Sequence, residues 1–343
     1  MGGCVCHPFF GERIAALMAE TAMITPASVR AQAGARVRLP PERKPPFRAV
    51  WQKHWRMYLM MMPAIILLLL FNAYPIWGIA IAFVDYNPFK GLAGSPFVGL
   101  EHFQRFFATP NAYNLFRNTL FIAIGKIIAG QLVALVFALA LNQVRVRFFQ
   151  RAVQTATTLP HFLSWIIIGG IMVQALSTTG IVNKGLTALG FPAVRFLGDA
   201  ALFPWTLIGL ETWKEFGWGA VLYLAALTAI NPELYEAAAI DGAGRWMREW
   251  HITLPGIAPM IILLSALSLG GILNAGFEQI LVLINPVTYR TGDVLDTFVY
   301  REGLLAAKFS LGTAVGLFKS VIGLGMILFS WWLADKLANY RIF

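Results

Sequence analysis

The stretch EAAAIDGAGRWMREWHITLP, residues Glu236–Pro255, is charged and helix-like, yet it lies between two of the most apolar parts of the chain. Just before it, Asn231 can cap a helix and Pro232 suits the first helical position. Gly242 can adopt a left-handed conformation and end that helix. Over residues 231–255 the pattern therefore predicts a short helix, a sharp glycine bend and a second short helix.

Two interpretations of this segment follow from its local chemistry. Its small alanines let the backbone of another protein approach closely. The apolar runs on both sides can transmit a movement of the segment to the spans that they form. Such an element can fit a groove on a soluble partner. The alternative is an amphipathic loop that lies on the lipid surface, and the local pattern is compatible with both.

The composition places the chain in a membrane. Of its 343 residues, 58% are hydrophobic and only 13% are charged, whereas a soluble domain carries roughly 25% charged residues. The formal net charge of +10 does not indicate nucleic acid as a partner, because the basic residues flank apolar runs, as membrane topology requires. The two cysteines, Cys4 and Cys6, lie at the N-terminus, which excludes a disulfide framework and a cysteine-rich metal site.

Apolar runs predict an all-α membrane protein. A helix needs about 20 apolar residues to cross the hydrocarbon core of a bilayer, and the chain has six candidate runs. The first contains LMMMPAIILLLLF and is the clearest, whereas the fourth is the least clear because it carries Glu211, Lys214 and Glu215. The predicted spans are about 58–84, 114–142, 153–176, 203–230, 256–284 and 312–335.

Basic residues orient these spans. Lys and Arg precede the first span, lie between the second and third and between the fourth and fifth, and recur at the C-terminus. With six spans all these regions fall on one side, which the positive-inside rule makes cytoplasmic. We therefore expect a multi-pass protein of the bacterial inner membrane, with both termini and residues 231–255 in the cytoplasm.

The N-terminal region divides in two. Residues 1–46 are rich in Ala, Arg and Pro without sustained periodicity, which predicts a mobile cytoplasmic extension. Residues 47–57 precede the transmembrane domain 58–343 and place Trp51 and Trp55 near one helical face. That pattern predicts an interfacial amphipathic helix.

Several motifs together resemble a known family. Glu236-Ala237-Ala238, then Gly242, then Ile252-x-Leu254-Pro255 resembles the EAA motif of permease subunits in binding-protein-dependent ABC importers. The fuller run LYEAAAIDGAGRWMREWHITLP is similar to the carbohydrate branch, and YPIWGIAIAF, RNTLFIAIGK and GWGAVLYLAAL agree with it. The run GFEQILVLINPVTYRTGDVLDTFVYREGL resembles the subgroup that imports oligosaccharides and polysaccharide fragments, including pectin- and alginate-type substrates. The resemblance covers roughly 57–343.

This resemblance implies a fold, a mechanism and partners. The fold is a type I permease of six transmembrane helices, whose EAA helix sits in a cleft of an ATP-binding subunit. Carried over, Glu236, Ala237, Asp241 and Gly242 couple this chain to the ATPase. The implied partners are a second permease subunit, as a heterodimer, two ATP-binding subunits and an external solute-binding protein.

The chain carries no sign of catalysis. It has no GxxxxGK[ST] phosphate loop, no HExxH pattern, no nucleophile elbow and no paired-cysteine zinc pattern. We therefore expect a non-enzymatic subunit without a cofactor of its own, with ATP and Mg bound by the partner ATPase.

Polar residues in the spans predict a path for the sugar, because ionisable groups there are costly and usually face a cavity or a partner. Asn274 and Glu278 are four apart, which would place them on one helical face, and Gln279 is adjacent. Trp213 can stack on a sugar ring and Lys126 suits an acidic sugar. In the alternative interpretation Lys214 or Lys319 pairs with Glu211, Glu215 or Glu278 and holds the bundle together, and Trp213 anchors the chain at the interface.

Two other functions remain open at this point. A secondary transporter driven by an ion gradient predicts internal inverted repeats and broken spans at the midplane; the sequence has no convincing repeat. A membrane scaffold without transport would tolerate neutral replacements of the intramembrane charges. The long external loops 85–113 and 285–311 predict docking surfaces for a substrate-binding protein.

Overall fold

The computed structural model describes residues 47–338 and divides the chain into two units that meet between Phe71 and Asn72. The predicted extension 1–46 lies outside the described residues. Apart from an isolated antiparallel bridge between Val84 and Phe97, the regular structure of the described part is helical. The expected all-α architecture is confirmed.

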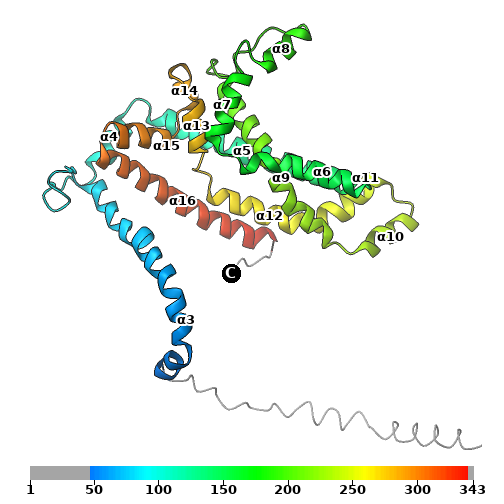
Figure 1. Cartoon of the computed structure of the whole chain (residues 1–343), viewed down its shortest axis with the longest axis horizontal. Coiled ribbons are helices and arrows are strands. Elements are labelled where there is room, and N and C mark those ends of the chain that lie inside the picture. Colours follow the sequence, from blue (N-terminus) through cyan, green and yellow to red (C-terminus); the bar gives the residue numbers. More distant parts are fainter. Residues whose placement is uncertain (1–46, 339–343) are drawn as a thin grey trace, which may run out of the picture. The chain divides into compact units, whose positions relative to one another are not determined.

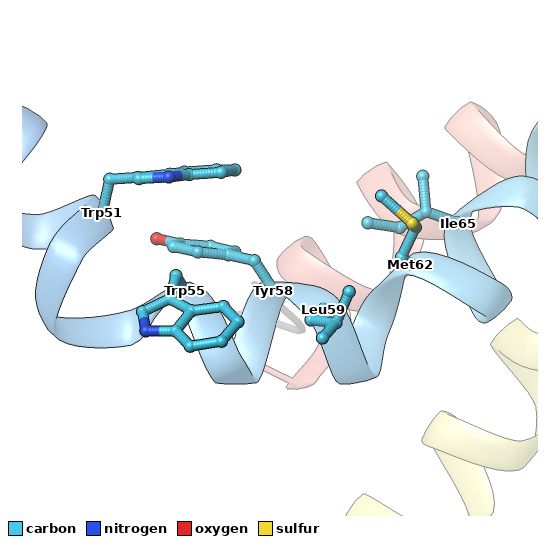
Figure 2. A pocket seen from close by; sticks show the side chains of 6 residues that line it. All are labelled: Trp51, Trp55, Tyr58, Leu59, Met62 and Ile65. Carbon is cyan, nitrogen blue, oxygen red and sulfur yellow. The ribbon is translucent and has the colours of Figure 1, made fainter.

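The first unit contains one long helix, α3 (Phe47–Leu68). The predicted helix over 47–57 forms the first part of α3 and leads into the first predicted span without a break, because no glycine or proline interrupts the chain before Pro63. The rings of Trp51 and Tyr58 stack with their centroids 5.1 Å apart (Figure 2). With Trp55 they line a shallow apolar hollow on one face of the helix, in line with the predicted aromatic face.

The second unit is built around two parallel helices, α5 (Ala112–Asn142) and α9 (Phe203–Thr228) (Figure 1). A Cβ on Gly125 of α5 would meet Ile208 of α9, and a Cβ on Gly219 of α9 would meet Ala134 of α5. The later residue of one helix therefore lies beside the later residue of the other, so the two helices run in the same direction. A third helix, α12 (Leu254–Gly270), packs on α16 (Phe309–Ala338). The remaining elements of this unit are η1 from Asn72 on (Leu69–Ala73), η2 (Tyr74–Phe83), α4 (Glu101–Ala108), α6 (Arg147–Thr158), η3 (Leu159–Phe162), α7 (Trp165–Ala175), α8 (Ile181–Ala188), α10 (Pro232–Ile240), α11 (Arg245–Arg248), η4 (Glu249–Thr253), α13 (Phe277–Leu283), η5 (Pro286–Thr288), α14 (Tyr289–Gly292), α15 (Leu295–Phe298) and η6 (Val299–Leu305).

Within residues 47–338, four continuous helical stretches are long and apolar enough to cross a membrane. A bent pair of helices would be a fifth. The helix α9 has 26 residues but carries Glu211, Lys214 and Glu215, the charges that made the fourth predicted span the least clear. The four stretches are His54–Phe83, Ala112–Asn142, Arg245–Gly270 and Phe309–Trp332.

The third predicted span, 153–176, is not one straight helix. The stretch Arg147–Phe162 and the helix Trp165–Ala175 meet at an angle of 103°. Pro160 lies in η3, between the end of α6 and the break, and its ring cannot continue the hydrogen-bond pattern of α6. The side chain of Ser164 then accepts a hydrogen bond from the Ile167 amide and caps the new helix.

The fifth predicted span, 256–284, is also interrupted. The helix α12 ends at Gly270, and α13 begins only after Gly276, which has a left-handed φ of 88°. The prediction that Asn274 and Glu278 share a helical face is therefore wrong, because Asn274 lies in the connection between the two helices. The adjacent glycines Gly270 and Gly271 end α12. Gly276, in its left-handed conformation, changes the direction of the backbone before α13 begins.

Gly217 allows α9 to approach the end of α6, and its replacement gives a direct test of the packing. A Cβ there would lie 2.2 Å from the carbonyl oxygen of Thr157. We expect Gly217→Ala to destabilise the protein by about 1–3 kcal/mol, because backbone atoms must move apart. Thermal unfolding in detergent measures the effect. Gly209→Ala in the same helix is the matched control, since a Cβ there meets nothing within 4 Å; equal melting temperatures would contradict the close approach.

Candidate functional site

The segment 231–255, here called the coupling segment, lies at the end of the parallel pair formed by α5 and α9 (Figure 1). The side chain of Asn231 accepts a hydrogen bond of 3.1 Å from the Glu233 amide, and Pro232 begins α10. The helix ends before Gly242, whose φ is 78°, and α11 begins at Arg245. The predicted order of helix, glycine bend and second helix is therefore found.

One side-chain contact closes the coupling segment on itself, and a second contact holds it to α5. The hydroxyl of Tyr235 in α10 lies 3.0 Å from the hydroxyl of the buried Thr253, which directly precedes α12. Gln143, at the end of α5, donates a hydrogen bond of 3.1 Å to Glu249. The helix α10 is thereby tied to the start of α12, and η4 is tied to the end of α5.

The outer side of the coupling segment is exposed and partly apolar. Glu236, Ala237, Asp241 and Gly242 are all exposed. Ile240 is 87% exposed and Trp246 79% exposed. Large apolar side chains that gather on an exposed face mark a surface for a protein partner or for lipid, so the arrangement is suited to docking.

A polar cluster in the middle of the bundle joins three elements. The ammonium of Lys126 in α5 donates hydrogen bonds to the carbonyl oxygen of Ala275, at 2.6 Å, and to the side-chain oxygen of Gln279. It also forms an ion pair of 3.4 Å with Glu211 of α9. The Gln279 side chain is fully buried and donates to the carbonyl oxygen of Leu207. Two of the predicted pathway residues, Lys126 and Gln279, therefore bind each other.

The remaining charges of α9 hold the broken α6–α7 connection. Glu215 accepts from Lys214 at 2.9 Å and lies 2.7 Å from the His161 ring nitrogen, while Lys214 also donates to the carbonyl oxygen of His161. The ring of Trp218 stacks on His161 with centroids 4.7 Å apart. Lys319 pairs with Asp296 at 2.5 Å. Lys214 therefore pairs with Glu215, as the alternative interpretation expected, whereas the partner of Lys319 is Asp296 and none of the three expected glutamates.

A groove of about 240 Å³ runs between α5, α9 and α12 beside this cluster. Its polar lining includes Gln131, which donates to Ser268 at 3.0 Å and accepts from Ser265. The aromatic residues Trp218 and Tyr223 and the charged Lys126 and Glu215 also line it. Hydroxyl-bearing substrates need such hydrogen-bonding groups together with aromatic surfaces.

Four of the five predicted pathway residues do not line this groove, and one of them, Gln279, is buried in the adjacent polar cluster. Asn274 and Glu278 are exposed, and Trp213 is 44% exposed. Sequence reasoning missed Gln131 and Ser268; the signal that points to them is a polar residue inside an otherwise apolar run. The hydrogen bond between Gln131 of α5 and Ser268 of α12 could not be predicted from the sequence pattern.

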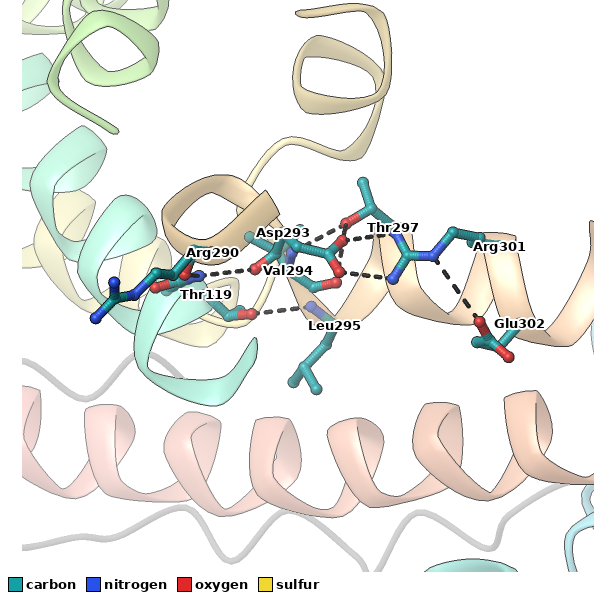
Figure 3. A network of polar contacts seen from close by, with 9 residues as sticks. Thr119, Arg290, Asp293, Val294, Leu295, Thr297, Arg301 and Glu302 are labelled. Atoms are coloured by element: carbon teal, nitrogen blue, oxygen red, sulfur yellow. Dashed lines mark hydrogen bonds and ion pairs between the residues drawn. The ribbon is translucent and has the colours of Figure 1, made fainter. Parts of the chain in front are cut away.

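A second polar network lies at the opposite end of α5 from the coupling segment (Figure 3). Arg301 forms two hydrogen bonds with Asp293, at 2.7 and 3.2 Å, and Thr297 donates to the same carboxylate at 2.7 Å. The bond to Asp293 raises the pKa of the Arg301 guanidinium above its already high ordinary value, so the guanidinium stays charged. Asn118 of α5 donates to the carbonyl oxygens of Arg290 and Asp293, both at 3.1 Å.

Comparison with known proteins gives a family match. The model of the family described as "Binding-protein-dependent transport system inner membrane component" matches residues 130–339. Among relatives in Bacillus subtilis (strain 168), Protein LplB is 41% identical over 84% of this chain and 91% of its own. The polygalacturonan/rhamnogalacturonan transport system permease protein YteP is 40% identical over 86% of this chain and 92% of its own.

A solved structure is similar over nearly its whole length. It is a bacterial alginate ABC transporter in complex with an alginate pentasaccharide-bound periplasmic protein. The matching chain is 36% identical, with a TM-score of 0.78 over 85% of this chain and 98% of that chain. The overall fold of this chain is therefore that of a chain of a bacterial ABC transporter.

Proposed function

This chain belongs to the binding-protein-dependent transport system inner membrane component family, and on that premise we propose that it is the permease subunit of an ATP-driven ABC importer for oligosaccharides or polysaccharide fragments. The observation that carries the proposal is the 0.78 TM-score to a chain of the alginate transporter, at 36% identity. Identity at this level over most of both chains supports a shared activity, whereas a likeness of fold alone would not.

The substrate class that we propose is an acidic oligosaccharide. Two of the similar proteins are named for polygalacturonan, rhamnogalacturonan and alginate. Polygalacturonan and alginate are polyuronates, whose sugars each carry a carboxylate. The groove beside Lys126 contains hydrogen-bonding groups, aromatic rings and one ammonium, and this supports a path for such a substrate. Asn274, Glu278, Gln279 and Trp213 stay proposed contacts for other stages of the transport cycle.

The coupling segment is the proposed contact with the ATPase. Glu236, Ala237, Asp241 and Gly242 are exposed on the coupling segment, in which α10 contacts Thr253 just before α12 and Glu249 contacts the end of α5. In the proposed mechanism, closure of two ATP-binding subunits around ATP and Mg pulls α10 and rocks the bundle between inward- and outward-facing states. This chain holds no nucleotide in that scheme, because its role is to convert the movement.

The proposed assembly has one further permease chain, forming a heterodimer, two ATP-binding subunits and an external solute-binding protein. The chain crosses the inner membrane six times, with α9 and the bent α6–α7 pair counted as spans and both termini cytoplasmic. The basic loops support this orientation. It places the coupling segment inside the cell and the network around Asp293 outside.

The alternative function, a secondary transporter driven by an ion gradient, has less support than the ATP-driven importer. Broken helices such as α12–α13 are found in transporters of that class. The family match argues for the ATP-driven importer, because the family is named for transport that depends on a binding protein.

Uptake into proteoliposomes separates the two candidates. The full complex should accumulate trigalacturonate only with ATP and the binding protein, and collapse of the ion gradients with ionophores should leave the rate unchanged. Uptake by this chain alone, driven by an imposed proton or sodium gradient, would establish the secondary transporter instead. Vesicles that carry the complex without the binding protein are the control.

A further inference from the structure

A hollow of about 420 Å³ lies at the end of α5 opposite to the coupling segment. It is formed by the beginning of α5 and by the segment from α14 to η6 (Figure 1). These two parts are far apart in the sequence but line the same hollow. We call it the distal hollow. Its lining residues are Asn111, Asn114, Leu115, Asn118, Tyr289, Arg290, Asp293 and Arg301.

One wall of the distal hollow is held firmly. The buried Asn118 side chain donates to two carbonyl oxygens of the α14 segment, and the neighbouring Thr119 accepts a hydrogen bond of 3.0 Å from the Leu295 amide. Arg301 lies over the ring of Tyr289, 4.9 Å from its centroid, while it pairs with Asp293. Because these groups satisfy one another, they form a preorganised surface.

Arg290 differs from the other charged residues of the hollow. Asn118 holds its backbone carbonyl, whereas its guanidinium points away from the network (Figure 3). Within residues 47–338 this guanidinium makes no ion pair or side-chain hydrogen bond, and its side chain is exposed. Arg301 is neutralised by Asp293, so the two arginines and one aspartate leave one net positive charge, at Arg290.

The polar groups next to Arg290 are also available. In the described part of the chain the side-chain amides of Asn111 and Asn114 have no hydrogen-bond partner. Both residues lie at the beginning of α5, where the partial positive charge of a long helix favours an anion. A guanidinium binds a carboxylate with two parallel hydrogen bonds, and amides can bind sugar hydroxyls.

We propose that the distal hollow is an outer subsite for a carboxylate-bearing sugar unit, with Arg290 binding the carboxylate and Asn111 and Asn114 the hydroxyls. This inference rests on the proposed import of acidic oligosaccharides and deepens it by assigning a residue to the recognition of the charge. The subsite receives the sugar chain outside the membrane, before it reaches the groove at Lys126. A docking contact for the solute-binding protein is the competing use of the same surface.

Direct binding tests the subsite without the binding protein. Purified transporter complex is mixed with trigalacturonate or with its fully methyl-esterified, uncharged form, and saturation-transfer NMR reports contact. We expect binding of the acid to weaken about three- to tenfold in Arg290→Gln, with the ester bound weakly and equally by both proteins. Arg195→Gln is the matched control, because it removes an exposed arginine from the proposed outer side away from the hollow.

Each other outcome overturns the proposal. Three results would show that Arg290 does not bind a carboxylate: no contact of the acid with the wild-type complex, unchanged binding in Arg290→Gln, or an equal loss of binding for acid and ester. If instead Arg290→Gln raises only the binding-protein concentration needed for half-maximal uptake, the surface is a docking contact. Import of acidic oligosaccharides is measured separately in proteoliposomes, so its failure is distinguishable from failure of the subsite.

Discussion

Replacing Gly242 by proline is expected to reduce ATP-dependent uptake by the assembled transporter to about a tenth or less, a loss that corresponds to roughly 1.4 kcal/mol or more of coupling free energy. Gly242 has a φ of 78°, whereas a proline ring holds φ near −65°. Its amide also donates a 3.2 Å hydrogen bond to the Ala239 carbonyl oxygen, and proline has no such donor. The bend between α10 and α11 would therefore open.

The loss should arise at the contact with the ATPase and not from unfolding. Gly242 is exposed and a Cβ there meets nothing within 4 Å in this chain, so membrane insertion and the bundle should persist. Co-purification of the ATP-binding subunit measures the contact, and uptake measures its consequence. Glu236→Lys, which reverses an exposed charge on α10, should weaken capture in the same assay.

Gly244→Ala is the matched control for Gly242→Pro. Gly244 is exposed two residues away, has a φ of −65° that alanine adopts readily, and has open space at its Cβ position. This variant should capture the ATPase and transport at close to the wild-type rate. Normal capture and normal uptake in both Gly242→Pro and Glu236→Lys would show that the segment does not couple the two subunits.

Replacing Lys126 by methionine is expected to give a large loss of stability, about 3 kcal/mol. The change leaves the carbonyl oxygen of Ala275 and the side-chain oxygen of Gln279 without their donor, and it removes the counter-charge of Glu211. The Lys126 side chain is only 9% exposed, so water cannot readily replace these bonds. Thermal unfolding of the detergent-solubilised complex measures the effect.

A second variant separates the structural role of Lys126 from contact with the sugar. Lys126→Met combined with Glu211→Gln removes both charges and should recover much of the lost stability, because no buried charge is left unpaired. If Lys126 also binds the sugar carboxylate, the stable double variant should import acidic oligosaccharides poorly. A wild-type uptake rate in that variant would confine Lys126 to the structural role.

The pair Lys319–Asp296 provides the control for this experiment. It is an ion pair of 2.5 Å within the same unit, and neither residue lines the groove beside Lys126. Lys319→Met with Asp296→Asn should therefore leave the uptake of acidic sugars unchanged once the protein is folded. A similar loss of uptake in both double variants would indicate a general defect and would contradict a specific role for Lys126 in the path.

The sequence by itself determined the features that depend on residues near one another in the chain. The cap at Asn231, the proline at the start of α10 and the left-handed glycine after it predict the helix, the bend and the second helix of the coupling segment. Hydropathy predicts the long helices α5 and α16 to within a few residues. Both signals act within a window of about 20 residues or less, so the linear pattern contains them.

Only the tertiary structure decided where helices break and which polar residues meet. Hydropathy continues through Pro160 and through Gly270–Gly271, although the backbone turns there, because apolar residues favour burial in either conformation. Lys126 meets Glu211 and Gln279 from positions 85 and 153 residues away. Such pairings depend on how three elements pack, and no local propensity encodes them. The same physical reason explains why the groove and the distal hollow became visible only in the folded chain.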